Sequence, residues 1–316
     1  MMSLLTTPPA DAALEIAPDS VSVVVAAPRT RDAALQGYAV QPLAPGAVTA
    51  SLTARNVLDR DAVLQALRRA FERLGTRPRR VALLVPDVAA RVSLVRFERV
   101  PARREDLEQL MRWQVRKAAP FPIEDAVLTW VPAARTPEGE QEFLVVLARR
   151  DVIREYEDLC DALGMHAGVV DLATFGVVNL LLASPGVPVG DWLVVYMRPE
   201  YTSLAILRGD QTLFFRTVAE TDTETLPDVV HQTTMYYQDR LSGQGFAQVI
   251  LSGYGRTPET LDEASRSLEA RLSSPVQRLD RARAPILTSK ITASPATLAA
   301  LTPAIGTLLR MRAEAA

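Results

Sequence analysis

The two halves of this chain carry the same order of predicted elements, and this repetition constrains the fold more than any other feature of the sequence. In each half, short runs typical of antiparallel strands come first, and a helix, a strand and a second helix follow. The clearest break between the halves is SPGVPVG, residues 184–190. With 316 residues, the chain is also long for one compact core. The pattern therefore predicts an α/β protein with two similar lobes and a cleft between them.

The first half opens with two short strands in residues 13–27, joined by a turn at Pro18 and Asp19. Asp59 is expected to cap a helix that Gly75 closes, because the apolar residues between them recur at helical spacing. RRVALLVP predicts a buried strand. The strands and helices predicted around these cover residues 37–48, 79–86, 92–101, 104–119, 125–133, 142–150 and 151–164.

The second half opens with three strands joined by tight turns, the last of which is formed by Gly209 and Asp210. Its predicted elements are the strands 191–199, 201–209 and 211–219, the helix 226–242, the strand 247–255 and the helix 258–272. The tail, residues 295–315, is predicted to be a helix broken at Pro303, because proline removes a hydrogen bond from a helix interior.

A proline corner closes the basic helix of the first half, in VRKAAPFPIEDAVLTW, residues 115–130. Pro120 is expected to end the helix, since the residue before a proline is pushed out of the α region. Pro122 then holds the chain extended as it enters the next strand. Phe121 lies between them with a fixed backbone direction. Two interpretations stay open: a rigid corner that packs one subdomain, or a corner of the surface that meets a partner.

The composition excludes several classes of protein. A net charge of −2 gives no bias toward nucleic acid. No run reaches the roughly 20 apolar residues that cross a bilayer. Residues 1–12 lack the features of a signal peptide, and a short disordered arm is expected there. These features predict a cytoplasmic protein.

The sequence shows no constellation for metal or nucleophilic chemistry. Cys160, the single cysteine, is predicted to be a buried core thiol. His166 and His231 lie outside any metal-ligand spacing, so no metal site is expected. Asp171 is interpreted as a helix N-cap or a strand-end acid, with a cleft-facing role as the alternative. Tyr236 and Tyr237 are predicted to pack in the core and at its rim.

Five stretches of the chain, taken in order, resemble the PilM family of type IV pilus assembly proteins, which are related to the division protein FtsA. These are ALEIAPDSVSVVVA, the proline corner with its strand, FLVVLARRDVIREYEDLCDALGMHAGVVDLATFGVVNLL, VVHQTTMYYQDRLSGQGFAQVILSGYG and LTPAIGTLLR. The resemblance implies an actin-like (ribonuclease H-like) two-lobed fold with an inserted FtsA/PilM-type subdomain. It places the first lobe at 13–185 with the insertion at about 86–165, the second lobe at 186–293, and a helix that returns to the first lobe at 294–316.

The resemblance also implies a nucleotide cleft, whose first phosphate loop is altered here. Such loops need glycine, because only a residue without Cβ lets the backbone approach phosphate closely. The expected Asp-Ile-Gly begins instead with Glu15, and Ala17 and Pro18 replace the flexible part. Ser20 keeps the small hydroxyl of the pattern.

The second phosphate loop departs further from the family pattern. Arg198 and a proline stand where an acid and a glycine are expected, and only Thr202 or Ser203 could supply the hydroxyl. The adenosine loop is partly kept as Ser252, Gly253 and Gly255, with a tyrosine between the glycines. Phosphoryl transfer needs positioned loops and metal-assisted charge stabilisation. We therefore expect a pseudo-ATPase with no catalytic residues and no bound cofactor, and ATP binding that is weak or lost. The rival interpretation is that Arg198 holds phosphate in place of a metal.

Members of the family recruit the short cytoplasmic tail of an inner-membrane protein, PilN, and the resemblance implies a PilN-like partner here. An extended peptide in a groove between subdomains would be the physical route. The protein would then lie at the inner face of the inner membrane through its partners only, with other platform proteins and self-association as further contacts. Alternatives of the same fold are an ATPase that switches partner binding, a sugar-kinase- or chaperone-type enzyme, and a filament-forming protein.

Overall fold

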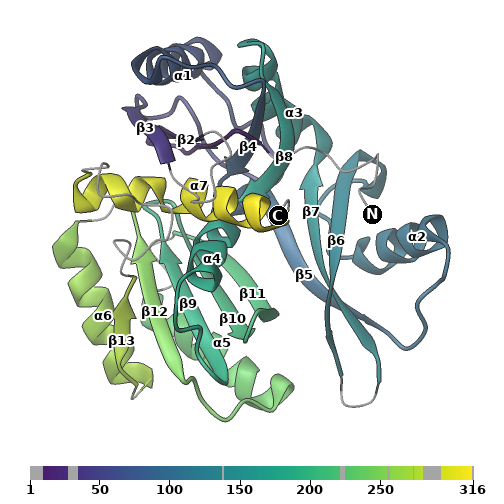
Figure 1. Ribbon diagram of the computed structural model, residues 1–316. Coiled ribbons are helices and arrows are strands. Elements are labelled where there is room, and N and C mark those ends of the chain that lie inside the picture. The colour runs from purple at the N-terminus through teal and green to yellow at the C-terminus, as the bar shows by residue number, and fades with distance from the viewer. Residues whose placement is uncertain are drawn as a thin grey trace.

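Three β-sheets and the helices packed on them form the molecule in this computed structural model (Figure 1). The structure describes residues 10–27, 35–136, 139–220, 225–254, 257–272, 274–279 and 293–314. The arm expected at 1–12 lies outside the described residues except for its last three, which lead into the first strand. No helix in the described part of the chain is both long and apolar enough to cross a bilayer.

The first sheet has the strand order β3-β2-β1-β4-β8, with the β1–β4 and β4–β8 pairs parallel. Its strands are β1 (Ala12–Ile16), β2 (Ser20–Ala26), β3 (Leu35–Pro42), β4 (Arg80–Val85) and β8 (His166–Leu172). One face packs on α1 (Arg60–Leu74) and α3 (Arg150–Asp161), and the other on α4 (Ala173–Ala183) and α7 (Pro295–Glu314). Because both faces are covered, β1, β2 and β4 are apolar nearly throughout, as parallel-type central strands require.

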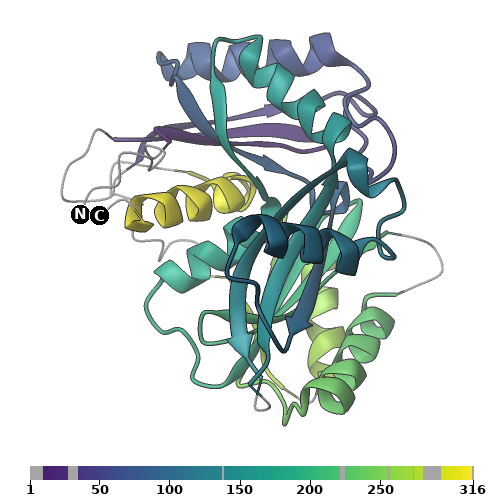
Figure 2. The same cartoon turned by 90° about the vertical axis from the view of Figure 1, so that its right-hand side faces the viewer.

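The second sheet has the order β11-β10-β9-β12-β13. Its strands are β9 (Asp191–Met197), β10 (Tyr201–Arg208), β11 (Gln211–Ala219), β12 (Gln248–Gly253) and β13 (Val276–Arg278). The helices α5 (Leu226–Leu241) and α6 (Pro258–Leu272) cover its outer face. Its inner face shares one core with α4, α7 and the first sheet, so the two lobes pack on a common helical layer (Figure 2).

The third sheet is inserted between β4 and β8 of the first lobe. Its order is β5-β7-β6, with all pairs antiparallel, and its strands are β5 (Ala90–Phe97), β6 (Ala126–Arg135) and β7 (Gln141–Arg149). Helix α2 (Arg104–Val115) covers one face through a small core centred on Met111, Phe143 and Val145. Two 3₁₀ turns, η1 (Asp87–Ala89) and η2 (Ile123–Asp125), lie at the entrances to β5 and β6.

Two local predictions about helix ends were confirmed. The carboxylate of Asp59 accepts a hydrogen bond from the backbone N–H of Ala62 at 2.9 Å, as an N-cap does. Gly75 closes α1 in the left-handed conformation, with φ of 63°. Both residues satisfy backbone groups that the helix itself leaves without partners.

Two predicted helix boundaries were wrong. Helix α2 ends at Val115 and its last turns continue as non-helical turns through Ala118, so the chain leaves the helix before Pro120 restricts it. Helix α7 is not broken at Pro303 but runs through it. The helix lies buried between the lobes, and the packing of this buried face outweighs the one backbone hydrogen bond that proline removes.

Candidate functional site

Two tight turns face each other where the two lobes meet. The turn between β1 and β2 is closed by a hydrogen bond from the N–H of Ala17 to the carbonyl of Ser20, at 2.9 Å. The turn between β9 and β10 is closed in the same way from Arg198 to Tyr201, at 2.8 Å. These turns contain the residues that the resemblance compares with phosphate loops, and neither turn contains a glycine. Each has a proline, which removes a backbone donor that a phosphate would need.

Arg198 extends from the second lobe into the first. Its side chain is 1% exposed, and its Nη2 donates to Oδ1 of Asp19 at 2.8 Å, an ion pair between the two turns. The guanidinium also lies over the ring of Tyr254, 4.9 Å from its centroid. Although burial alone would lower the pKa of Arg198, the nearby tyrosines and carboxylates hold it well above its ordinary value. A permanent cation of the protein itself therefore occupies the space between the two turns.

Glu15 lies beneath this ion pair at 2% exposure, on β1. Burial raises the pKa of its carboxyl to about 7, although the charge of Arg198 opposes the shift. Two buried tyrosines, Tyr196 and Tyr201, belong to the same cluster and interact with each other edge to face. A carboxyl that is half protonated at neutral pH is a poor replacement for the acid that would hold a hydrated metal ion.

Replacing Glu15 by glutamine is expected to stabilise the protein at pH 8 and to leave its stability nearly unchanged at pH 5. The carboxyl titrates near 4.5 when unfolded and near 7 when folded, so the folded state is favoured by protonation. This contribution is complete below pH 4.5 and is lost as the pH rises through 7, which amounts to roughly 3 kcal/mol. Urea unfolding of both proteins at the two pH values measures it. A variant less stable than the parent at pH 8 would show instead that Glu15 is an ionised partner of Arg198.

The small hydroxyl residues predicted for the cleft lie near these turns. The hydroxyl of Ser20 donates to Oδ1 of Asp19 at 3.0 Å, and that of Ser203 donates to Oδ2 of Asp87 at 2.6 Å, so both bind carboxylates of the protein itself. Ser252 is buried in β12, and Thr202, largely buried at the start of β10, lines the pocket beside the second turn.

Gly253 is required by a close backbone approach at the end of β12. A Cβ atom there would lie 2.8 Å from the carbonyl oxygen of Met197 on β9. Its role in this structure is thus to let β12 approach β9 closely. Gly255, also predicted for this loop, lies outside the described residues.

Asp87 is a buried site residue that the sequence reasoning missed. Its Oδ1 accepts from the backbone N–H of Thr174 at 3.0 Å, and its Oδ2 from the hydroxyls of Thr174 and Ser203. The carboxylate thereby caps α4 and joins it to η1 of the first lobe and to β10 of the second. Burial raises the pKa of this carboxyl above its usual range. The available signal was an acid directly after the buried strand, in LLVPDVAA.

Asp171 is a strand-end acid and not the N-cap of α4. It lies in β8, where its Oδ2 accepts from Nη1 of Arg310 on α7 at 3.0 Å, and its Oδ1 from the N–H of Leu172 at 2.9 Å. The N-cap position of α4 is Leu172, which has no capping side chain, and Asp87 supplies that function from another segment.

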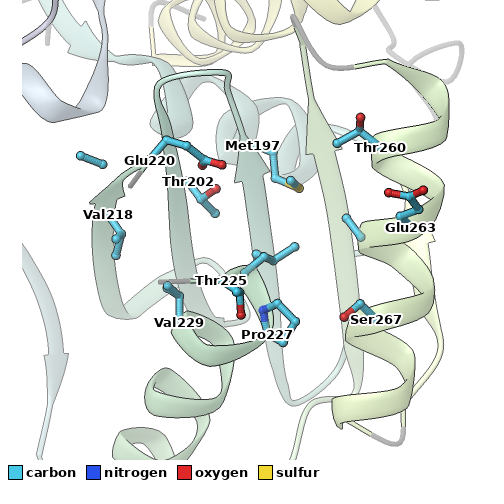
Figure 3. Close-up of a pocket in the computed structure, with 13 residues that line it drawn as sticks. Met197, Thr202, Val218, Glu220, Thr225, Pro227, Val229, Thr260, Glu263 and Ser267 are labelled. Atoms are coloured by element: carbon cyan, nitrogen blue, oxygen red, sulfur yellow. The ribbon is translucent and has the colours of Figure 1, made fainter. Parts of the chain in front are cut away.

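A pocket of roughly 380 Å³ lies beside the second turn, between α5, α6 and the ends of β9 to β11 (Figure 3). Its floor is largely apolar, and Glu220 and Glu263 line it from opposite sides. None of its described lining residues is a lysine or arginine. The pocket therefore offers no charge that would attract the phosphates of a nucleotide.

The remaining candidates behave as structural groups. Cys160 is buried, and burial raises the pKa of its thiol to about 12, which leaves it unreactive. The hydroxyl of Tyr237 donates to Oδ2 of Asp191 at 2.7 Å in the core, while Tyr236 is exposed and packs on Phe214 at the rim. Within the described ranges, no group of three His, Cys, Asp or Glu side chains is arranged to hold a metal ion.

The proline corner lies between α2 and β6 of the inserted subdomain. Phe121 is half-buried and packs into the core beneath α2, while Pro120 and Pro122 are exposed. The carbonyl of Pro122 accepts from the N–H of Asp125 at 3.0 Å, which closes η2 and presents Glu124 and Asp125 to solvent. Nη1 of Arg112 on α2 also binds the carbonyl of Ile123 at 3.1 Å. The corner is therefore rigid, and its acidic side chains are exposed.

Comparison with known proteins gives a consistent result. A family model described as "Type IV pilus assembly protein PilM" matches residues 13–221. A solved structure of a "PilM-PilN type IV pilus biogenesis complex" is similar with a TM-score of 0.80 and 20% identity, over 96% of this chain and 99% of that chain. The cytoplasmic domain of EpsL, an inner-membrane component of the type II secretion system of Vibrio cholerae, matches with a TM-score of 0.50 and 12% identity, over 96% and 94% of the two chains.

No curated protein sequence matches this chain. The structural likenesses confirm the predicted actin-like ATPase fold.

Proposed function

This chain belongs to the family of type IV pilus assembly protein PilM, and from that premise we propose that it is an actin-like adaptor that does not hydrolyse ATP. It would bind the cytoplasmic tail of a PilN-like membrane protein and lie in the cytoplasm at the inner face of the inner membrane. The machine would be a type IV pilus or a related secretion system.

The single observation that carries the pseudo-ATPase part is the buried Arg198 side chain between the two turns. A nucleotide would have to displace a guanidinium that is already paired with Asp19 and stacked on Tyr254. Arginine is a capable phosphate ligand, but breaking a buried ion pair costs several kcal/mol before any phosphate is bound. The buried, largely neutral Glu15 adds no fixed negative charge for a metal ion.

The tail-binding part is supported by the likeness to the PilM–PilN complex, which covers nearly the whole of both chains. Tails of inner-membrane proteins carry an excess of lysine and arginine on the cytoplasmic side. A surface that receives such a tail should therefore be acidic, with exposed apolar side chains to give affinity.

The junction between the first sheet's loop at 49–58 and the inserted subdomain has these properties. Nε of Arg149, at the end of β7, donates to Asp151 at 2.6 Å, and its Nη1 binds the carbonyl of Thr53. The pKa of Arg149 is raised, first by the hydrogen bond to Asp151 and also by the charges of Asp125 and Glu155, which places these carboxylates around the junction.

Apolar side chains are exposed in the two segments that meet at this junction. Leu58 is 52% exposed at the end of the loop, and Val127 is 36% exposed at the start of β6. Both could be covered by apolar residues of an extended tail. Because η2 follows the proline corner directly, the corner fixes the position of Glu124 and Asp125. In this proposal these two carboxylates face the tail.

One calorimetric experiment with two titrants tests the proposal. A synthetic peptide of the cytoplasmic tail of the PilN-like protein from the same organism is expected to bind, while Mg-ATP shows no binding tighter than about 1 mM. Asp125→Lys should weaken the peptide about ten-fold, because it reverses a charge at the surface of the junction. The matched control, Glu72→Lys on the exposed face of α1, should leave the affinity unchanged.

Each part can fail separately. A micromolar dissociation constant for Mg-ATP would contradict the pseudo-ATPase, and a change of tail affinity on adding ATP would favour the switching ATPase instead. Absence of peptide binding at low salt would contradict the adaptor. Equal loss of binding in both lysine variants would show that general charge, and not the junction, attracts the tail.

A further inference from the structure

Strand β6 forms a long open edge of the inserted three-stranded sheet. Within the described residues it is hydrogen-bonded to β7 alone, over Ala126 to Arg135, and no second strand is hydrogen-bonded along its other side. The strand is ten residues long and exposes Val131 at 55%. Natural proteins usually shorten, charge or cover such an edge, and only Pro132 and Arg135 near its far end do so here.

A pocket opens beside the middle of this edge, on the face of the sheet that α2 covers. Its volume is roughly 430 Å³. It is lined by Pro101, Ala102, Arg104, Leu107, Leu128, Thr129 and Trp130. Five of these seven side chains are apolar, so a large aliphatic side chain that enters from the edge would find apolar side chains to contact there.

The one charged residue among the described lining residues of this pocket is a cation. Arg104, the first residue of α2, lines it and is exposed, whereas the acidic Glu105 and Asp106 of the same turn are not among the lining residues. A ligand with a carboxylate next to its apolar anchor matches this arrangement.

We propose that the β6 edge binds an extended peptide segment of a second protein as a fourth strand of the sheet. The segment carries a large aliphatic residue for the pocket and a carboxylate that pairs with Arg104. Main-chain hydrogen bonds to β6 supply affinity, and the alternation of side chains gives register and specificity.

This occupant differs from the tail of the proposed membrane partner. A juxtamembrane tail is basic, and Arg104 in the pocket would repel it, whereas the acidic junction near Asp125 attracts it. A second copy of this chain is also disfavoured, because its β6 brings no carboxylate to Arg104 and two-fold pairing of β6 strands would place the two Arg104 residues on one paired sheet. The adaptor would then join two components: a basic one at the junction near Asp125 and an acidic one at Arg104 beside β6.

The probe is a fluorescein-labelled octapeptide that alternates leucine with threonine and carries one glutamate, and its binding to the full chain is followed by fluorescence anisotropy. Arg104→Glu is expected to weaken this peptide about ten-fold and to strengthen the version with lysine in place of glutamate by a similar factor. Glutamate in the first turn of α2 is favourable for the helix, so the fold should persist. Arg77→Glu, an exposed site in the first lobe, is the charge-matched control.

Two further measurements test the edge itself. Val131→Lys should weaken both peptides, since a lysine on an edge strand opposes strand addition. A peptide N-methylated at every residue, which cannot donate main-chain hydrogen bonds from either edge, should not bind. Equal affinity of the methylated peptide, an unchanged charge preference in Arg104→Glu, or a dimer that Val131→Lys dissolves in sedimentation would each overturn the proposal. The tail peptide should bind all three variants alike, which keeps this outcome separate from the proposed function.

Discussion

Replacement of Arg198 by methionine is expected to lower the free energy of unfolding by about 2 kcal/mol, because it removes the buried partner of an ion pair in which Asp19 is 32% exposed. Methionine fills much of the same volume but leaves Asp19 without its cation and Tyr254 without the guanidinium above its ring. Urea unfolding followed by circular dichroism measures the loss. The effect should exceed that of a surface pair because this side chain connects the two lobes.

Arg278→Met is the matched control. Arg278 pairs with Asp262 at the same distance of 2.8 Å, but both side chains are largely exposed, and such a pair contributes only about 0–1 kcal/mol. The double variant of Arg198→Met with Asp19→Asn should recover part of the loss, since no unpaired charge remains. If Arg198→Met costs no more than the control, the guanidinium does not hold the lobes together, and the cleft is open to a ligand.

Replacement of Gly306 by alanine should destabilise the protein by at least about 3 kcal/mol, although alanine is the better helix former by about 1 kcal/mol. A Cβ at Gly306 would lie 1.8 Å from the carbonyl oxygen of Gly176 on α4 and 2.7 Å from the backbone nitrogen of Leu180. Backbone atoms cannot move aside as a flexible side chain can, so α7 and α4 would have to separate. Thermal and urea unfolding of the variant measure this cost.

Gly186→Ala is the control for this prediction. Gly186 has φ of 91° and nothing within 4 Å of the added Cβ, so only the strain of the left-handed conformation remains, about 1 kcal/mol. Gly176→Ala should resemble Gly306→Ala, because its Cβ would lie 2.2 Å from the carbonyl oxygen of Pro303. A stabilised Gly306→Ala protein would mean that intrinsic helix propensity outweighs the contact between α4 and α7.

The fold was largely readable from the sequence, because burial leaves a periodic pattern that one chain segment carries by itself. The apolar strands β1, β2 and β4, the cap at Asp59 and the stop at Gly75 are all local signals. The two wrong helix ends lie where tertiary contacts decide. Pro303 is tolerated because α7 is buried between the lobes, and α2 ends early in the turns before the proline corner.

The site was readable in part. The resemblance predicted where both turns lie and which of their residues differ from the family pattern, since those are differences of residue type. It did not show that Arg198 is paired with Asp19, residues that lie 179 positions apart in the chain. Nor did it find Asp87, whose partners Thr174 and Ser203 come from α4 and the other lobe. Such contacts have no period and no local spacing.

The sequence by itself determined most of the strands and helices and predicted two lobes, while the actin-like architecture was implied by the resemblance to a known family. The strands and helices depend on burial periodicity and on the backbone freedom of single residues, which are properties of short segments. Only the tertiary structure decided what lies between the two turns and at the edge of the inserted sheet: a buried arginine that joins the lobes, a buried carboxyl with a pKa of about 7, and a β6 edge beside a pocket lined by Arg104. Charge pairing, desolvation and an unpaired strand edge depend on which segments meet in space. A short stretch of sequence does not show which distant segment it will meet.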